Sequence, residues 1–334
     1  MNNALTRRLT CIGGLALLTC GDWAQAQSSL TIYGIIDQGI TKANRGTTAG
    51  AMLPGRAAPD IWTIKAGNTS RLGFRGREEL GGGSYARFQM EHRVALDTGT
   101  PSNPNVFWLG RSVVAIGDKQ WGEVYTGREY SPVYWIALFA DPTALSYVGQ
   151  LGTTYTYANY TAVAASVEAS NNRWSNSVGY KSPTWKGMSV EVATALGERA
   201  RKRNDSANIQ YRDGPVWLAA GTDRMDSRNN MSIVAAGYDF GVVFPTATYS
   251  RARGGLAGDA TSYALAVRVP LSFGRAYGSY GKLRPADSRD AAMVGTGVEY
   301  DLSKRSLLYA NLGSAKRDSF SRTTAFDAGF KHTF

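Results

Sequence analysis

Arginine residues recur with even spacing in two stretches of the sequence. Arg71, Arg75 and Arg77 occupy odd positions of residues 71–77, and Arg87 and Arg93 occupy odd positions of residues 86–94. The alternate positions carry the apolar residues Leu72, Phe74, Ala86, Phe88, Met90 and Val94. Successive side chains of a β-strand point to opposite faces, so these arginines would share one face of a sheet. A row of fixed guanidinium groups attracts anions.

Catalytic chemistry has few candidate residues in this chain. Only His92 and His332 could serve as histidine bases, and the sequence contains no G-x-S-x-G, H-E-x-x-H or Walker A pattern. The adjacent Glu78 and Glu79 would point to opposite faces of a strand end and could not act together on one bond. We therefore expect no catalytic residue, no cofactor and no bound metal.

The first 26 residues have the features of a secretory signal peptide. Arg7 and Arg8 precede an apolar stretch, and A-Q-A at 24–26 provides a cleavage site. Both cysteines, at positions 11 and 20, lie in this segment, so the exported chain would have no disulfide and no cysteine-bound zinc. We predict a cleaved signal peptide at 1–26 and one domain over 27–334.

From residue 28 onward the hydrophobic pattern repeats every two residues, which indicates strands rather than helices. Beyond the first 26 residues no run of about 18 apolar residues could form a membrane-spanning helix. Sixteen strand-like runs are predicted, with starts near residues 30, 70, 85, 107, 123, 172, 188, 207, 216, 231, 242, 261, 275, 291, 306 and 321. Short connections alternate with mostly longer ones, as in an up-and-down barrel. The short connection at 226–229 fits this pattern least well.

The chain is basic, with 37 Lys and Arg against 26 Asp and Glu, a formal charge of +11. Loss of residues 1–26 removes two positive charges and one negative charge and leaves +10. A nucleic-acid partner is not expected, because the chain is exported and has no contiguous basic run. Arginine on a lipid-facing surface is costly, so the arginine-bearing faces are expected to line water.

Six ordered segments resemble the general porin family of Gram-negative β-proteobacteria. They are S-L-T-I-Y-G-I-I-D at 29–37, S-R-L-G-F-R-G-R-E-E-L-G-G-G at 70–83, G-E-V-Y-T-G-R-E at 122–129, N-S-V-G-Y-K-S-P at 176–183, Y-D-L-S-K-R at 300–305 and G-F-K-H-T-F at 329–334. Residues 130–170 match no motif of the family. The resemblance implies a sixteen-stranded antiparallel transmembrane β-barrel in the outer membrane, forming a homotrimer. It also implies that the third loop folds inward and narrows a water-filled pore.

The pore wall is then predicted from the arginine pattern and the resemblance together. The expected wall residues are Arg71, Arg75, Arg87, Arg93, Arg111 and Arg128, of which Arg111 and Arg128 depend more on the resemblance. Glu129 and Asp141 are expected to oppose them from the third loop. Surplus positive charge predicts an anion-preferring channel for small hydrophilic solutes, unless these two acids neutralise the wall and leave weak selectivity. Lipid and lipopolysaccharide of the outer membrane are the expected surroundings.

Two other functions remain as alternatives to the pore. One is an outer-membrane barrel enzyme, a lipid hydrolase or protease, which would need a polar catalytic triad at the strand ends. The other is a secreted β-sandwich that binds a ligand, which would share the two-residue pattern but dissolve without detergent.

Overall fold

Antiparallel strands make up most of the chain. A computed structural model describes residues 28–43, 61–160, 172–198, 203–254, 258–319 and 322–334. The signal peptide predicted at 1–26 lies outside the described residues. None of the helices among the described residues is long and apolar enough to cross a membrane.

Sixteen long strands form the wall of a closed barrel. They are β1 (Ser28–Ala43), β3 (Arg71–Gly81), β4 (Ser84–Ala95), β6 (Ser112–Asp118), β7 (Gly122–Tyr130), β8 (Arg173–Lys181), β9 (Met188–Ala195), β10 (Asn204–Asp213), β11 (Val216–Arg224), β12 (Asn230–Tyr238), β13 (Phe244–Arg253), β14 (Ala260–Leu271), β15 (Gly274–Pro285), β16 (Ala291–Asp301), β17 (Ser306–Arg317) and β18 (Thr323–Thr333). Two short strands, β2 (Trp62–Lys65) and β5 (Thr100–Pro101), lie in the first two long connections.

The barrel closes because β1 pairs with strands on both of its sides. Its first half pairs with β3, in a register that places Ile35 opposite Arg71. Its second half pairs with β18, with Gly39 opposite Gly329. All sixteen predicted strands are present, and the predicted fold class is confirmed. The largest error in a start is at β6, which begins at Ser112 rather than near residue 107.

The outer face of the barrel is apolar. Large hydrophobic side chains remain exposed on most strands, among them Leu30, Ile32, Val114, Ile116, Val190, Ile209, Leu218, Val234, Leu265, Val294 and Leu312. In water such a surface would cost about 25 cal/mol for each Å² of apolar area. A belt of this kind is typical of strands that face lipid. The apolar side chains of the alternating sequence pattern therefore point outward, and the charged side chains point inward.

Candidate functional site

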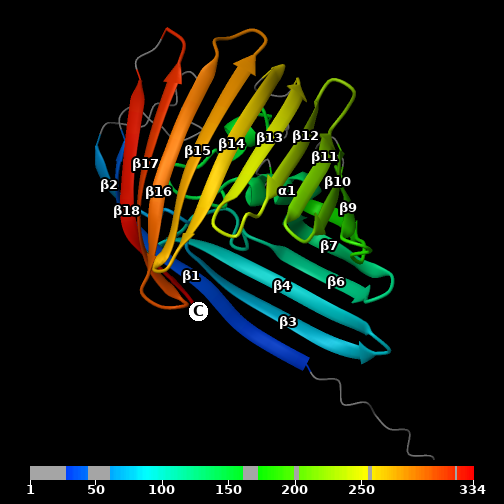
Figure 1. The fold of residues 1–334 in the computed structure, drawn as a ribbon. Helices are drawn as coiled ribbons and strands as arrows, with labels where there is room; N and C mark the ends of the chain where they lie inside the picture. The colour runs from blue at the N-terminus through cyan, green and yellow to red at the C-terminus, as the bar shows by residue number, and fades with distance from the viewer. Residues whose placement is uncertain (1–27, 44–60, 161–171, 199–202, 255–257, 320–321) are drawn as a thin grey trace, which may run out of the picture.

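The third long connection, between β7 and β8, is called the third loop below, and its described residues 131–160 fold into the barrel. It contains helices α1 (Pro132–Ala140) and α2 (Gly152–Thr156). Helix α1 contacts β9 to β13, and α2 contacts β13 to β15. Figure 1 shows the strands as one curved wall with α1 beside their inner side. The inward-folded third loop is confirmed.

Helix α1 has a sequence suited to burial. Its nine residues, P-V-Y-W-I-A-L-F-A, carry no charge and are apolar on nearly all sides. Pro132 opens it at a position where a proline is favourable, because the first amide groups of a helix have no partner inside it. Pro142 disfavours a helical conformation at Asp141, which is extended at ψ 126°, so the helix ends there.

The wall behind the third loop is lined with very small residues. A Cβ atom on Gly295 would lie 2.0 Å from the Gly149 carbonyl oxygen, and one on Gly313 would lie 2.4 Å from that of Val148. Ser279 Oγ donates a hydrogen bond of 3.0 Å to the same Gly149 oxygen. The backbone of the loop therefore lies directly on β15, β16 and β17.

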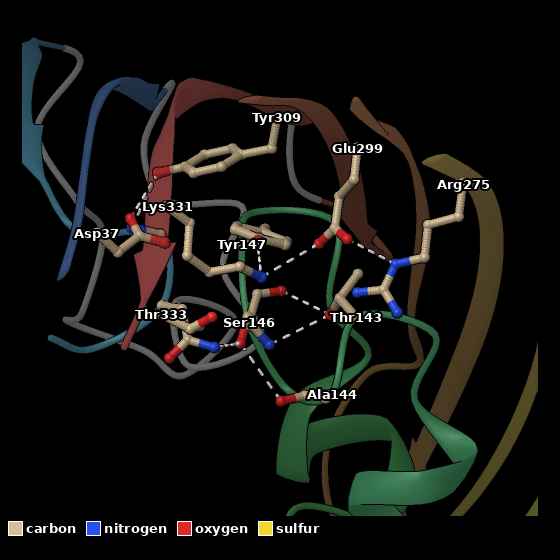
Figure 2. A network of polar contacts seen from close by, with 12 residues as sticks. Asp37, Thr143, Ala144, Ser146, Tyr147, Arg275, Glu299, Tyr309, Lys331 and Thr333 are labelled. Atoms are coloured by element: carbon tan, nitrogen blue, oxygen red, sulfur yellow. Dashed lines mark hydrogen bonds and ion pairs between the residues drawn. The ribbon is translucent and has the colours of Figure 1, made fainter. Parts of the chain in front are cut away.

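Polar contacts around Tyr147 hold the far part of the loop in place (Figure 2). Lys331 Nζ donates to Tyr147 Oη at 2.9 Å and lies 3.5 Å from Glu299. Glu299 also pairs with Arg275 at 2.6 Å. The Tyr147 amide donates to the Gly67 carbonyl at 3.0 Å. These contacts connect the loop to β15, β16 and β18 and to the segment that precedes β3.

Asp141 stabilises the internal structure of the loop. Its carboxylate is buried and accepts hydrogen bonds from Thr143 N (2.8 Å), Thr143 Oγ1 (2.7 Å), Leu151 N (2.7 Å) and Gly152 N (3.2 Å). Burial raises the pKa of the Asp141 carboxyl above its ordinary value, while these hydrogen bonds act to lower it. This one side chain thus joins the end of α1 to the start of α2.

A cavity of about 640 Å³, called the loop-side cavity, separates the third loop from β3 and β4. Among the described residues, four arginines line it, together with a single acidic residue, Glu91. These arginines are Arg71, Arg93, Arg111 and Arg173. The third loop contributes mainly uncharged side chains to the opposite side. The cavity is therefore positive on its wall side.

Short ion pairs and hydrogen bonds fix these arginines. Arg93 contacts Glu91 at 2.6 Å, and Arg71 lies 3.8 Å from the same carboxylate. Arg71 also donates to the Asn68 side chain at 2.5 Å. Arg111 forms a two-pronged ion pair with Glu129. The guanidinium groups are thereby held in set orientations, which a selective passage requires.

Three other predicted wall residues lie away from this cavity. Arg75 is exposed, with its guanidinium carbon 5.2 Å from the centre of the Tyr33 ring. Arg87 pairs with Glu123 at 2.5 Å, closer to the short-turn rim. Arg128 is buried and donates to the Leu109 carbonyl at 3.1 Å and to Ser175 Oγ at 2.9 Å. Arg128 lies opposite Ser112, on the parity that faces away from the barrel interior.

The two predicted acids do not face the wall from the third loop. Glu129 belongs to the end of β7, is buried, and pairs with Arg111 on the same side of the cavity. Asp141 points into the loop and bonds its backbone, as described above. An acidic loop opposed to a basic wall is therefore not the arrangement that these two residues form. A negative side chain was expected in the pore, but Glu129 is held by Arg111, and Asp141 is held by the backbone amides of the loop.

A second cavity of about 560 Å³, called the turn-side cavity, lies on the other side of α1. Arg212, Arg268 and Arg275 line it, and the part of the chain that the structure describes adds no acidic residue to its lining. Trp135, Leu138 and Ala144 line both cavities, so the two cavities are adjacent along the third loop. Sequence reasoning missed this second group of arginines.

Neither histidine has the surroundings of a catalytic base. The His92 ring stacks on Phe107 at 4.2 Å, and its Nδ1 lies 2.6 Å from the Phe107 carbonyl. His332 Nδ1 lies 2.8 Å from Ser306 Oγ. In the part of the chain that the structure describes, no carboxylate contacts either ring, so no Ser-His-Asp arrangement is formed there.

A closed barrel with an apolar outer face, an inward loop and a charged inner passage defines a transmembrane β-barrel channel. The sequence model described as Gram-negative porin matches residues 14–319, most of the chain. The chain belongs to this family: it is an outer-membrane porin, integral to the outer membrane of a Gram-negative cell.

Individual porins are similar to the chain along most of its length. Outer membrane porin protein 32 of Delftia acidovorans is 28% identical over 327 residues, which cover 90% of this chain and 88% of that protein. The anion-selective porin from Comamonas acidovorans has a TM-score of 0.77 at 24% identity, covering 92% of this chain and all of that one. OmpT of Vibrio cholerae, in a structure described as its trimer form, has a TM-score of 0.68 at 14% identity and covers 92% and 99%.

Proposed function

We propose that this porin passes small hydrophilic anions in preference to cations. The observation that carries the proposal is the lining of the passage: of the residues that the structure describes, seven arginines and one glutamate line the two cavities together. Its narrow part would lie between the third loop and Arg71, Arg93 and Arg111. Arg75, Arg87 and Arg128 would contribute less, because other contacts hold them outside this part.

The physical basis is the energy of an ion close to a fixed charge. Two unit charges about 8 Å apart interact by about 0.5 kcal/mol in water, which changes an ion's occupancy about twofold. Several arginines act together on an ion in the passage, and a low-dielectric wall strengthens their effect. The anion-selective porin from Comamonas acidovorans, which has the same fold, supports the proposal.

Zero-current potentials in a salt gradient test the proposal. The purified porin in a planar bilayer is expected to give the sign of an anion-selective channel. The double variant Arg71→Ala/Arg93→Ala should reduce the ratio of anion to cation permeability about fivefold at low salt, since two charges are lost. Arg77→Ala is the matched control, because Arg77 pairs with Glu79 outside both cavities. A cation-selective sign, or equal loss in the control, would contradict this assignment.

Removing the acid from the wall should have the opposite effect. Glu91→Gln takes away the carboxylate that partly neutralises Arg71 and Arg93. The permeability ratio for anions over cations is expected to rise about twofold at low salt. Glu79→Gln, at the exposed pair with Arg77, is the control and should leave the ratio unchanged. A lower ratio in Glu91→Gln would mean that Glu91 serves mainly to hold the arginines in position.

We further propose that the porin is a homotrimer whose outer face contacts membrane lipid and whose long loops meet lipopolysaccharide. The apolar outer face supports the lipid contact, and the trimer form of OmpT, which shares the fold, supports the assembly. Gel migration of a mild detergent extract tests the assembly. A band about three times the monomer mass should appear before heating and be lost after it. A monomer band in both samples would exclude a stable trimer.

A further inference from the structure

The turn-side cavity combines three arginines with an apolar surface of the third loop. Trp135, Leu138, Phe139 and Pro142 provide the apolar part. We propose that this cavity is a binding site for aromatic carboxylates on their way through the pore. The proposal rests on the channel function above, and it adds a solute class to it.

Arg212 is the residue best placed to hold the carboxylate. Its guanidinium carbon lies 3.8 Å from the centre of the Phe139 ring, which stacks against one face of the group. Among the described residues this guanidinium group has no hydrogen-bond or ion-pair partner, and the residue is exposed. A stacked guanidinium keeps its N–H groups free at the edge, where they can bind a carboxylate in two-pronged fashion.

The other two arginines add charge and are themselves fixed. Arg268 donates to the carbonyl oxygens of Phe139 and Asp141, so its charge is held next to the loop, and it pairs with no carboxylate among the described residues. Arg275 is paired with Glu299. Positive charge thus exceeds negative charge around the cavity, and Arg212 is the arginine whose N–H groups are available to a solute.

The apolar side distinguishes this cavity from a simple anion site. Phe139 packs against Trp217 at 4.5 Å and against Phe244 at 5.6 Å, which makes its ring a rigid surface beside Arg212. The volume of about 560 Å³ lies within the range of small-molecule sites. An apolar wall with one directed charged group fits a flat ring that carries a carboxylate. Chloride or acetate would use only the charged part.

Three related solutes separate the contributions of ring and charge. Benzoate has both groups, acetate has the carboxylate without a ring, and benzamide has the ring without charge. Calorimetric titration of the porin in detergent is expected to show benzoate binding at least about tenfold more tightly than either of the others. Benzoate should also reduce the chloride current of single channels. Equal binding of benzoate and acetate, or of benzoate and benzamide, would overturn the proposal.

Substitutions at Arg212 and Phe139 test whether benzoate binds in the turn-side cavity. Arg212→Gln should weaken benzoate binding about tenfold and lower the chloride conductance by a much smaller factor, because six other arginines still line the two cavities. Phe139→Leu should weaken benzoate binding less, through the loss of the surface that positions Arg212. Arg77→Gln is the control and should bind benzoate as the parent protein does. Unchanged benzoate affinity in Arg212→Gln would overturn the proposal.

A second variant and a second measurement ensure that the experiment decides for or against the proposal. If Arg212→Gln gives no channels, Arg212→Lys retains the charge but not the planar group, and a loss of about threefold in benzoate affinity is expected. Unchanged affinity in Arg212→Lys would overturn the assignment of Arg212. The zero-current potential in chloride is measured on the same preparations. Anion selectivity without preferred benzoate binding would contradict this inference alone, and benzoate binding without anion selectivity would contradict the proposed selectivity alone.

Discussion

Removal of the third loop is expected to raise the single-channel conductance about two- to threefold, because a sixteen-stranded barrel without an inner loop encloses a wide aqueous channel. The deletion can be designed from the structure. The Ser131 amide donates to the Asn172 carbonyl at 2.9 Å, so the two ends of the loop are adjacent. A short Gly-Ser linker can therefore replace residues 132–171 without separating β7 from β8.

The same deletion should weaken the selectivity of the pore. In the wider channel most ions would pass farther from Arg71, Arg93 and Arg111 than the screening length, which is about 10 Å at 0.1 M salt. The barrel should stay closed, since β1 pairs directly with β3 and β18. Heat-dependent gel migration checks that the variant is folded.

A deletion in another loop provides the control. Residues 98–101 comprise the end of an exposed turn and the short strand β5, and they line neither cavity. Their removal should leave both conductance and selectivity close to those of the parent protein. If the variant without the third loop conducts no more than the parent, the loop does not limit the passage, and the narrow part lies elsewhere.

The barrel could be predicted from the sequence because its determinants are local. In residues 71–77 of β3 and 86–94 of β4, arginine occurs only at odd positions and most even positions are apolar, so the period and the face assignment can be read directly. Short turns such as Gly81 to Gly83, all with positive φ between 61° and 97°, carry the glycines that left-handed backbone favours. The extra short strands β2 and β5 could not be predicted, since each pairs only a few residues at the rim.

The site was harder to predict because it depends on contacts between distant segments. Charge alone suggested that Asp141 faces the pore, but the sequence does not show that the amides of Leu151 and Gly152 need an acceptor. Arg212 and Arg268 are single arginines on β10 and β14, and only closure of the barrel brings them together at one helix. One signal was available: small residues such as Gly295 on the inner face of the wall mark where a loop backbone can lie.

Asp141→Ala is expected to loosen the third loop without opening the barrel. The substitution leaves the amides of Thr143, Leu151 and Gly152 without their acceptor in a buried place. An unsatisfied buried donor costs about 1–3 kcal/mol, so the loss of several should disrupt the packing of α1 against α2. The wall strands do not depend on this carboxylate. We therefore expect folded channels with a more mobile loop.

Current recordings and limited proteolysis report this change separately. The variant should show increased noise in the open-channel current, and its third loop should be cut at protease concentrations that leave the parent intact. Asp239→Ala is the matched control: Asp239 accepts a hydrogen bond of 2.8 Å from the Gly241 amide in an exposed turn between β12 and β13. It should behave as the parent protein in both assays. A quiet, protease-resistant Asp141→Ala channel would show that the contacts of Tyr147 and the close packing on Gly295 and Gly313 hold the loop without the carboxylate.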